Sequence, residues 1–182
     1  MPLYTAGHGT RPFEELVVLL GEAGVGRVVD VRRFPGSRRN PHFGREALET
    51  ALPERGIGYE WWGETLGGRR RSPAGLSRHP AWREPSFGAY ADYMDTPGFR
   101  DALQGLLDSL STAPTTAVMC AETLWWHCHR RLIADAAELA GVDVVHLIGA
   151  GQRHRHALHP AVRSGRDGWP VYDVGVDRPL TR

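Results

Sequence analysis

The hydrophobic residues of this chain gather in short runs, and longer segments with helical spacing lie between the runs. Each run has a continuous apolar centre, which is typical of strands that are buried on both faces of a parallel sheet. The predicted strands are residues 3–6, 27–32, 57–61, 116–119 and 142–148, followed by a late strand at 169–173. Pro170 favours a sheet edge for the last strand, because proline cannot donate a hydrogen bond to a neighbouring strand.

Between the strands, apolar residues recur three and four positions apart and predict helices. The first helix begins after Thr10 as its N-cap, carries Pro12 in its first turn and ends at Gly24 and Gly26. The other predicted helices are residues 44–55, 96–110 and 131–140, with a helical turn at 90–94. This alternation predicts the α/β class: a mainly parallel sheet of about five to six strands with helices on both faces.

Length and composition indicate one domain over residues 1–182, with 41% hydrophobic and 24% charged residues. Residues 63–86 are rich in Gly, Arg, Ser and Pro and predict a long loop, a feature that is usually functional or mobile. No apolar run approaches the ~20 residues of a membrane span, and the N-terminus shows no signal-peptide pattern. Because two cysteines form no disulfide framework, we expect a cytoplasmic protein. The sequence assigns no oligomeric state.

The basic residues are clustered although the net charge is only +1. That small charge gives no global attraction to a nucleic acid or a membrane. All 22 residues counted as Lys or Arg are arginine, a bias that a GC-rich genome explains, but pairs and triplets recur at 32–33, 38–39 and 69–71. Arginine binds phosphate or carboxylate through two parallel N–H groups. We therefore expect local recognition of an anion in these loops.

Reactive side chains are most concentrated in residues 120–130, which contain both cysteines, a carboxylate, two histidines and an arginine. This segment joins a predicted strand to a predicted helix, and ligands of open α/β sheets bind at the carboxyl ends of strands. Other polar residues at or near strand ends are His8, Asp30, Arg32 and His146. We expect them to converge with Cys120 and Glu122 at one edge of the sheet.

Five motifs support a resemblance to a known family. They are Thr5–Pro12, Val29–Arg32 with Pro35–Arg38, Leu66–Gly68, Met119–Glu122 and Cys128–Arg130. In this order they resemble the bacterial and archaeal family called domain of unknown function 488, from about residue 3 to Tyr172. The resemblance implies a small α/β domain and assigns no reaction. Where the family usually has a short apolar residue or proline, this chain has Leu124-Trp-Trp-His127.

We predict an enzyme that acts on a phosphate-bearing substrate, a nucleotide or a nucleic acid, in a cleft at the strand ends. A cysteine between a strand and a helix N-terminus, near arginine, has a lowered pKa and becomes a nucleophile. The predicted catalytic residues are Cys120, Glu122, His129, Asp30 and His8. The predicted substrate-binding residues are Arg11, Arg32, Arg38, Arg69, Arg130 and Tyr93.

Structural roles remain open for several of these residues. Cys120 also fits a small core residue, Asp30 fits a buried ion pair with Arg32, and Glu122 fits a helix N-terminal cap. The turn Gly7–Gly9 lets backbone approach a ligand, but it lacks the third glycine of a dinucleotide motif and the Lys-Ser/Thr of a P-loop. Nucleotide binding through those two motifs is therefore not expected.

Two other functions also remain open. The first is a non-catalytic nucleic-acid-binding module, in which aromatic side chains stack on bases beside the arginines. The second is a thiol or zinc sensor built on Cys120, Cys128 and His129, with His8 or His146 as a fourth ligand. Against zinc, the eight-residue step between the cysteines is too long for a short ligand knuckle, and adjacent helical residues point in different directions. We therefore predict no metal and no cofactor, and we expect His154, His156 and His159 in a solvated loop.

Overall fold

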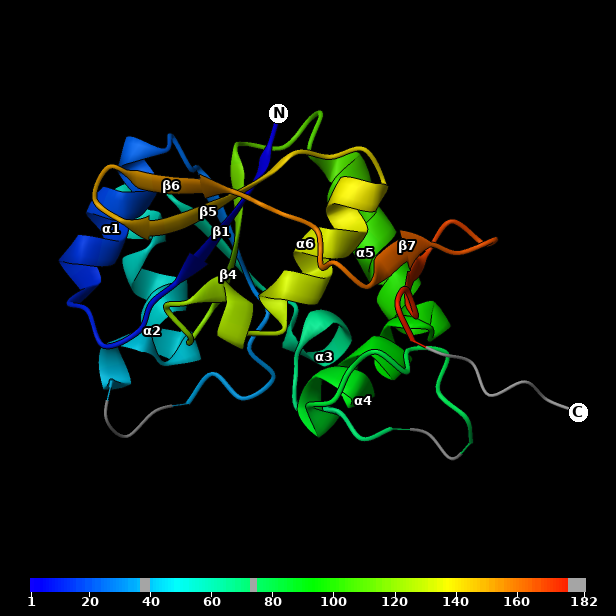
Figure 1. The fold of residues 1–182 in the computed structure, drawn as a ribbon. Coiled ribbons are helices and arrows are strands. Elements are labelled where there is room, and N and C mark those ends of the chain that lie inside the picture. Colours follow the sequence, from blue (N-terminus) through cyan, green and yellow to red (C-terminus); the bar gives the residue numbers. More distant parts are fainter. Residues whose placement is uncertain (37–39, 73–74, 177–182) are drawn as a thin grey trace, which may run out of the picture.

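The computed structural model describes residues 1–36, 40–72 and 75–176. Its centre is a six-stranded sheet with the strand order β3-β2-β4-β1-β5-β6 (Figure 1). The strands are β1 Leu3–Gly7, β2 Arg27–Asp30, β3 Gly58–Trp61, β4 Thr116–Cys120, β5 Val144–Gly149 and β6 Gln152–Arg155. The first five are parallel, and β6 pairs antiparallel with β5. The predicted mainly parallel sheet is confirmed.

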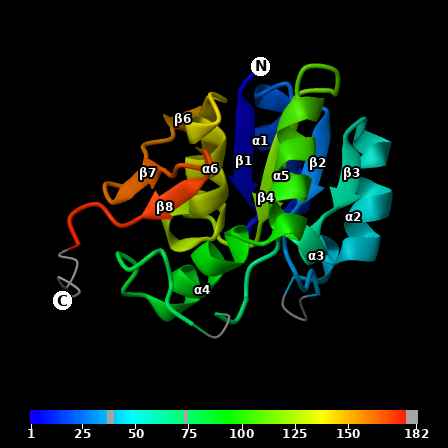
Figure 2. The same cartoon turned by 90° about the vertical axis from the view of Figure 1, so that its right-hand side faces the viewer.

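Helices cover both faces of this sheet, as the sequence predicts. They are α1 Phe13–Glu22, α2 Arg45–Ala51, α3 Gly63–Leu66, α4 Pro85–Met94, α5 Pro97–Ser109 and α6 Arg130–Leu139. Buried side chains of α1 and α2 pack on one face, and those of α4, α5 and α6 pack on the other. Figure 2 shows α5 in front of the sheet and α1 behind it. Among the described residues, none of the helices combines the length and the apolar character that crossing a membrane requires.

The central strand β4 is buried throughout, and this explains its unbroken apolar run. Successive side chains of a strand point to opposite faces. Ala117 and Met119 therefore pack on the side of α1 and α2, whereas Val118 and Cys120 pack on the side of α4, α5 and α6. The register of β4 thus decides which face of the sheet receives the thiol of Cys120.

The chain leaves the two central strands in opposite directions. From β1 it crosses through α1 to β2, and from β4 it crosses through α6 to β5 on the other side of β1. Ligand sites of open α/β sheets lie at such a reversal. The backbone amide of His8 donates to Cys120 O (3.0 Å), and that of Gly9 donates to Ala121 O (2.8 Å). The turn after β1 and the segment after β4 therefore lie side by side.

The structure corrects several element predictions. Residues 152–155 form β6 rather than a loop, because the turn at Gly151, with a φ of 65°, folds the chain back as a hairpin on β5. The late strand, β8 Pro170–Tyr172, pairs with β7 Val162–Ser164 in a separate two-stranded sheet and not at the edge of the main sheet.

The predicted long loop is partly helical. It begins with α3 and ends inside α4, which extends the predicted turn at 90–94 back to Pro85. Proline in the first turn of α4 costs no hydrogen bond there, because that N–H has no helical partner. The first helix begins after Pro12 rather than after Thr10.

We expect Gly7→Ala to destabilise the fold. A Cβ at Gly7 would lie 1.8 Å from the carbonyl oxygen of Glu122, and backbone must move to relieve that contact. Overpacking of this kind costs about 2 kcal/mol or more, which urea denaturation measures directly.

Gly21→Ala is the matched control, because a Cβ at Gly21 in α1 meets nothing within 4 Å. Alanine favours a helix, so this variant should be about 0.5–1 kcal/mol more stable than the parent chain. Equal stability of the two variants would show that the end of β1 does not press against the segment after β4.

Candidate functional site

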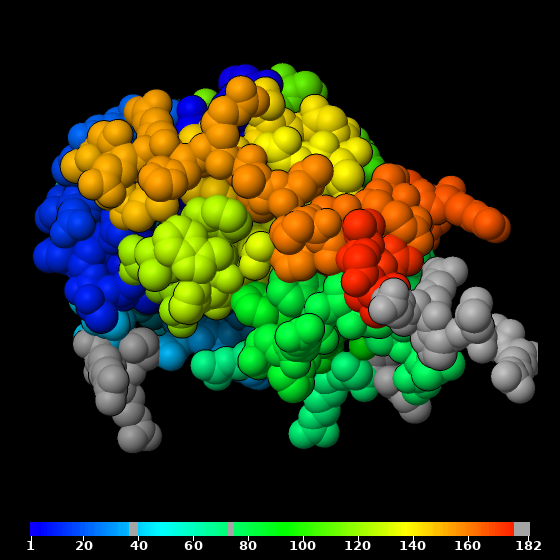
Figure 3. Space-filling view, viewed as in Figure 1, coloured from blue at the N-terminus to red at the C-terminus, as the bar shows by residue number. Residues whose placement is uncertain are grey.

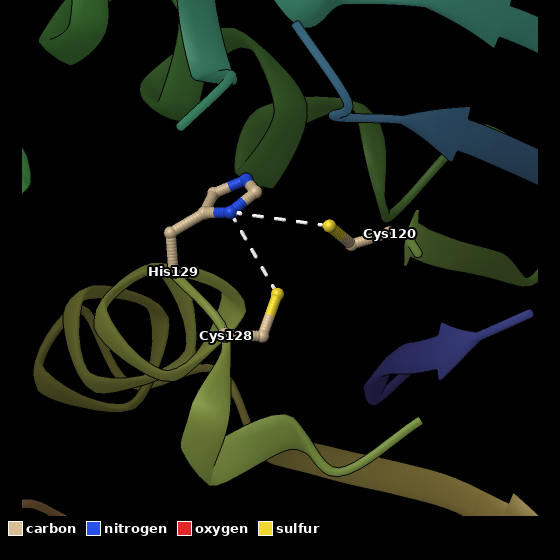
Figure 4. A group of neighbouring side chains, drawn as sticks. All are labelled: Cys120, Cys128 and His129. Atoms are coloured by element: carbon tan, nitrogen blue, oxygen red, sulfur yellow. Dashed lines mark hydrogen bonds between the residues drawn. The ribbon is translucent and has the colours of Figure 1, made fainter. Parts of the chain in front are cut away.

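Two thiols and an imidazole meet at the carboxyl end of β4. Cys120 ends that strand, Cys128 follows the 3-10 turn Trp125–His127, and His129 caps α6. His129 Nδ1 lies 3.9 Å from Cys120 Sγ and 3.7 Å from Cys128 Sγ, and all three atoms lie within 4.8 Å of one another. Figure 4 shows the imidazole and both sulfur atoms facing one another.

The backbone conformation explains how two neighbouring residues reach the same point. Cys128 is extended, with φ −128° and ψ 148°, and the helix begins only after His129. The two side chains therefore do not follow the angular step of a helix. This corrects the expectation that Cys128 and His129 diverge. The segment between the cysteines is a surface segment, yellow-green in Figure 3 and next to the green region that contains α4.

A backbone carbonyl sets the tautomer of His129. Its Nε2 lies 3.2 Å from the carbonyl oxygen of Val31, which only accepts hydrogen bonds, so Nε2 carries a proton. Nδ1 is then the atom that faces the two sulfurs. The ring packs at an angle against Tyr90, with 5.0 Å between the ring centroids. On another side Gly68 approaches so closely that a Cβ there would lie 2.9 Å from Nδ1.

The hydrogen bonds favour Cys128 over Cys120 as the negatively charged thiol. Burial by itself would raise the pKa of Cys128, but the hydrogen bond from Cys120 and the charge of Arg130 hold that pKa well below its ordinary value. The hydrogen bond to Cys128 and burial raise the pKa of Cys120 well above its ordinary value. Arg130 donates to Cys128 Sγ from Nε (3.4 Å) and from its backbone amide (3.5 Å).

Arg130 is buried next to the cluster and does not line the cleft. Only 1% of its surface is exposed. Its Nη1 donates to Thr5 Oγ1 (3.3 Å), and its Nη2 donates to the carbonyl oxygen of Glu122. Its guanidinium donors are thus engaged by protein groups from three segments.

Asp30 and Arg32 form a buried ion pair, which is the structural alternative that the sequence left open. Arg32 Nε and Nη2 donate to the carboxylate of Asp30, with 2.9 Å from Nε to Oδ1. Tyr59 Oη also donates to that carboxylate (2.7 Å). Arg32 Nη1 reaches the carbonyl oxygen of Phe43 (2.8 Å) and His8 Nε2 (3.0 Å). The pair joins β2 to the turn after β1.

His8 is a neutral acceptor in this arrangement. Burial and the neighbouring Arg32 lower the pKa of His8 to about 4. Its Nδ1 donates to the carbonyl oxygen of Gly9 (2.9 Å), and its ring stacks on Phe43 with centroids 4.3 Å apart. Arg11 holds the same turn by donating to the carbonyl oxygens of His8 and Ile148.

A cleft opens directly over the cluster. A cavity of about 590 Å³ is lined by Cys120, Cys128 and His129, and an adjoining hollow of about 560 Å³ extends over the turn after β1. The two hollows share six residues: Arg32, Phe34, Arg69, Ala121, Glu122 and His127. They therefore form one continuous cleft along the carboxyl edge of the sheet.

The structure brings most of the predicted site residues to this cleft. Its lining includes Cys120, Glu122, His129, His8, Arg32 and Arg69. Arg11, Arg130 and Tyr93 are not among its lining residues, and Asp30 lies behind Arg32. Tyr93 instead donates to the carbonyl oxygen of Thr65 (2.8 Å) and packs under Arg70. Arg38 lies outside the described residues.

Arg33, Gly68 and Tyr90 also line the cleft but were not among the predicted site residues, although Arg33 belongs to an arginine pair at which recognition of an anion was expected. The motif Leu66–Gly68 contained a signal for one of them, because a glycine beside a ligand-binding side chain marks close approach. Arg69 has a φ of 55°, the left-handed conformation that non-glycine residues avoid. Such local strain is found mainly at functional sites.

The two candidate fourth metal ligands do not join the cluster. His146 Nδ1 accepts from Thr5 Oγ1 (2.7 Å), and its Nε2 lies 2.9 Å from His156 Nδ1. Burial, His156 and Arg130 lower the pKa of His146 to about 2. Both nitrogens of His8 are also engaged, as described above. Among the described residues, Cys120, Cys128 and His129 are the group whose atoms suit a metal ion.

A family model described as Domain of unknown function DUF488 matches residues 12–137, a narrower range than the expected resemblance but more than half of the chain. That range contains Cys120, Cys128 and His129. No curated protein and no solved structure gives a significant match to the chain.

We expect acid to destabilise the protein through His8 and His146. Both are buried and neutral in the folded chain, whereas unfolded histidine has a pKa near about 6.5. Below that pH the unfolded chain binds protons that the folded chain excludes. The stabilisation is complete above pH ~6.5, and about 2 kcal/mol per histidine is lost by pH ~5. Urea denaturation at pH values from 7 to 5 measures it.

His146→Gln should remove about half of this loss between pH ~7 and ~5. His154→Gln is the matched control, because His154 is exposed and lies opposite His146 in the β5–β6 register. It should leave the pH dependence unchanged. The same pH dependence in both variants would contradict a buried, neutral His146.

We expect Arg69→Gly to stabilise the chain by about 1 kcal/mol, because glycine relieves the left-handed backbone strain. Arg71→Gly is the control: Arg71 does not have a positive φ, so glycine there should be neutral or slightly destabilising. Thermal and urea denaturation of the two variants compare the effects, and a destabilised Arg69→Gly chain would show that position 69 is unstrained.

Proposed function

The chain belongs to the DUF488 family, and we propose that it is a small enzyme acting on a phosphate-bearing substrate, a nucleotide or a nucleic acid. The substrate would bind in the cleft at the carboxyl edge of the sheet. One observation carries this proposal: the cluster of Cys120, Cys128 and His129 opens into a cleft that is also lined by Arg33 and Arg69.

The composition of the cluster favours a catalytic role over a role in core packing. An apolar core would place aliphatic side chains at the end of β4, whereas this chain buries two thiols beside an imidazole and a guanidinium. Burying charged and polar groups is costly unless each is paired. Strongly perturbed ionisable groups inside a cleft are typical of active sites.

Arg69 supports recognition of an anion. Its side chain is exposed at the cleft, and in the described part of the chain no hydrogen bond or ion pair holds its guanidinium. Its backbone oxygen accepts from Arg33 Nη1 (3.0 Å), which joins the two arginines at the cleft. Arg32, in contrast, is already paired with Asp30. A guanidinium that keeps its donors free is suited to bind phosphate through two N–H groups.

Exposed aromatic residues favour a nucleobase in the same substrate. Phe34 is 63% exposed and Trp126 is 38% exposed, and both line the cavity over the cluster. Aromatic faces beside arginine stack on unpaired bases. The net charge of +1 argues against a duplex held mainly by phosphate contacts. A nucleotide or a short single strand therefore fits the cleft better than a duplex.

We assign this activity to the cytoplasm. Both cysteines are free, and thiols that must stay reduced for chemistry persist in a reducing compartment.

Binding of defined probes tests the proposal. We expect calorimetry to detect binding of ribonucleoside triphosphates or of a short single-stranded oligonucleotide. Arg69→Gln should weaken that binding about tenfold or more, because a charge-assisted pair of hydrogen bonds is lost. Arg71→Gln, which changes an exposed arginine outside the cleft lining, should bind like the parent chain. No binding of any probe, or equal binding by both variants, would overturn the proposal.

Turnover separates an enzyme from a binding module. We expect chromatography of the bound probe to show conversion by the parent chain and none by Cys128→Ser, while Cys128→Ser still binds the probe. Binding without conversion in the parent chain, with affinity that falls steeply as salt rises, would instead identify a nucleic-acid-binding module.

A further inference from the structure

We propose that Cys120, Cys128 and His129 bind a Zn²⁺ ion, with a fourth coordination position that opens into the cleft. Two sulfur ligands and one imidazole nitrogen are a donor set that zinc prefers, and three protein ligands with one open position are the pattern of catalytic zinc sites. Zinc binding itself does not depend on the proposed function. Only the use of the fourth position by a phosphate-bearing substrate rests on it.

The distances between the donor atoms fit one tetrahedral ion. Zinc–sulfur bonds of about 2.3 Å and a zinc–nitrogen bond of about 2.1 Å place sulfur and nitrogen about 3.6 Å apart and the two sulfurs about 3.8 Å apart. The observed sulfur–nitrogen distances are 3.9 Å for Cys120 and 3.7 Å for Cys128. All three donor atoms lie within 4.8 Å of one another. The two sulfur–nitrogen distances thus exceed the ideal value by a few tenths of an ångström at most.

The tautomer of His129 gives the second argument. Nε2 donates to the carbonyl oxygen of Val31 (3.2 Å), so a neutral ring directs the lone pair of Nδ1 at both sulfurs. Histidine that binds a metal almost always donates its other N–H to a carboxylate or a backbone carbonyl. A cation between the three donor atoms would convert facing lone pairs into bonds.

Both sulfurs also have the hydrogen bonds that support metal-bound thiolates. Cys128 Sγ accepts from Nε and from the backbone amide of Arg130, and Cys120 has a hydrogen bond with the backbone of Glu122. Two thiolates at this separation repel each other. A divalent cation between the two sulfurs would neutralise them.

The open side of the site is kept clear by glycine. All three ligands line the cavity of about 590 Å³, together with Gly68. A Cβ at Gly68 would lie 2.9 Å from His129 Nδ1, the coordinating nitrogen. Any larger residue would crowd the metal position. The hard cations Mg²⁺ and Ca²⁺ prefer oxygen ligands and do not suit this donor set.

Metal analysis of the intact protein tests the proposal. We expect protein purified without chelator to hold about one zinc ion per chain, as measured by inductively coupled plasma mass spectrometry. After the zinc is removed by a chelator under reducing conditions, Co²⁺ should restore the site and give the intense visible absorption of a tetrahedral ion, with sulfur-to-cobalt charge transfer. The absence of zinc, together with the absence of these bands in folded, reduced protein, would overturn the proposal.

Variants locate the ion. His129→Gln and Cys128→Ser should weaken zinc binding by about 100-fold or more, since even outer partners of a metal site are worth about 10- to 100-fold. His127→Gln is the matched control, because His127 lines the same cavity but lies outside the cluster. Gly68→Ala keeps every ligand and should also weaken zinc binding. It therefore tests the site even if a ligand variant fails to fold. Unchanged affinity in His129→Gln would overturn the proposal.

Arg69→Gln separates this inference from the proposed function. It should lose affinity for the phosphate-bearing probes and keep its zinc. Zinc binding without probe binding in the parent chain would refute the proposed function alone, and probe binding by a chain that binds no zinc would refute the metal site alone.

Discussion

The site depends on one buried cation. Arg130 is almost wholly removed from solvent, and a guanidinium cannot shed its charge to relieve that burial. Its surroundings must therefore supply acceptors, and they do so from three segments: Cys128 Sγ before α6, Thr5 Oγ1 in β1, and the carbonyl oxygen of Glu122 after β4. Because one planar group satisfies all three, it holds these segments in a fixed relation. The shape of the cleft depends on how these three segments are held together.

From Thr5, a series of hydrogen bonds between buried polar groups connects β1 to β5 and then to α6. Thr5 Oγ1 lies 2.7 Å from His146, His146 lies 2.9 Å from His156, and His156 lies 2.9 Å from Asp135. Donation in one direction satisfies every member, since the carboxylate of Asp135 only accepts. Tyr172 Oη in β8 donates to the same carboxylate (2.9 Å). A row in which every polar group is paired is rigid, and it links the small second sheet to the site.

The hydrophobic pattern predicted the central strands well because β1, β2 and β4 are largely buried, which leaves a clear apolar run in each. It missed β6, whose residues are all exposed and whose pairing comes from a turn rather than from burial. At the site, the spacing of Asp30 and Arg32 showed that they share a face, but only tertiary contacts distinguish an ion pair from a free anion-binding arginine. The meeting of Cys128 and His129 depends on an extended residue ahead of a helix, which no periodicity records.

The alternation of side chains along β4 has a consequence for how this protein can change over evolution. Cys120 faces α4, α5 and α6 while Met119 faces α1 and α2. Loss or gain of a single residue within β4 would exchange those faces and carry the thiol to the wrong side of the sheet, although the composition would hardly change. We therefore expect residues 116–120 not to tolerate a change in chain length. An insertion in the connecting segment 110–115, before β4 begins, would leave that alternation unchanged.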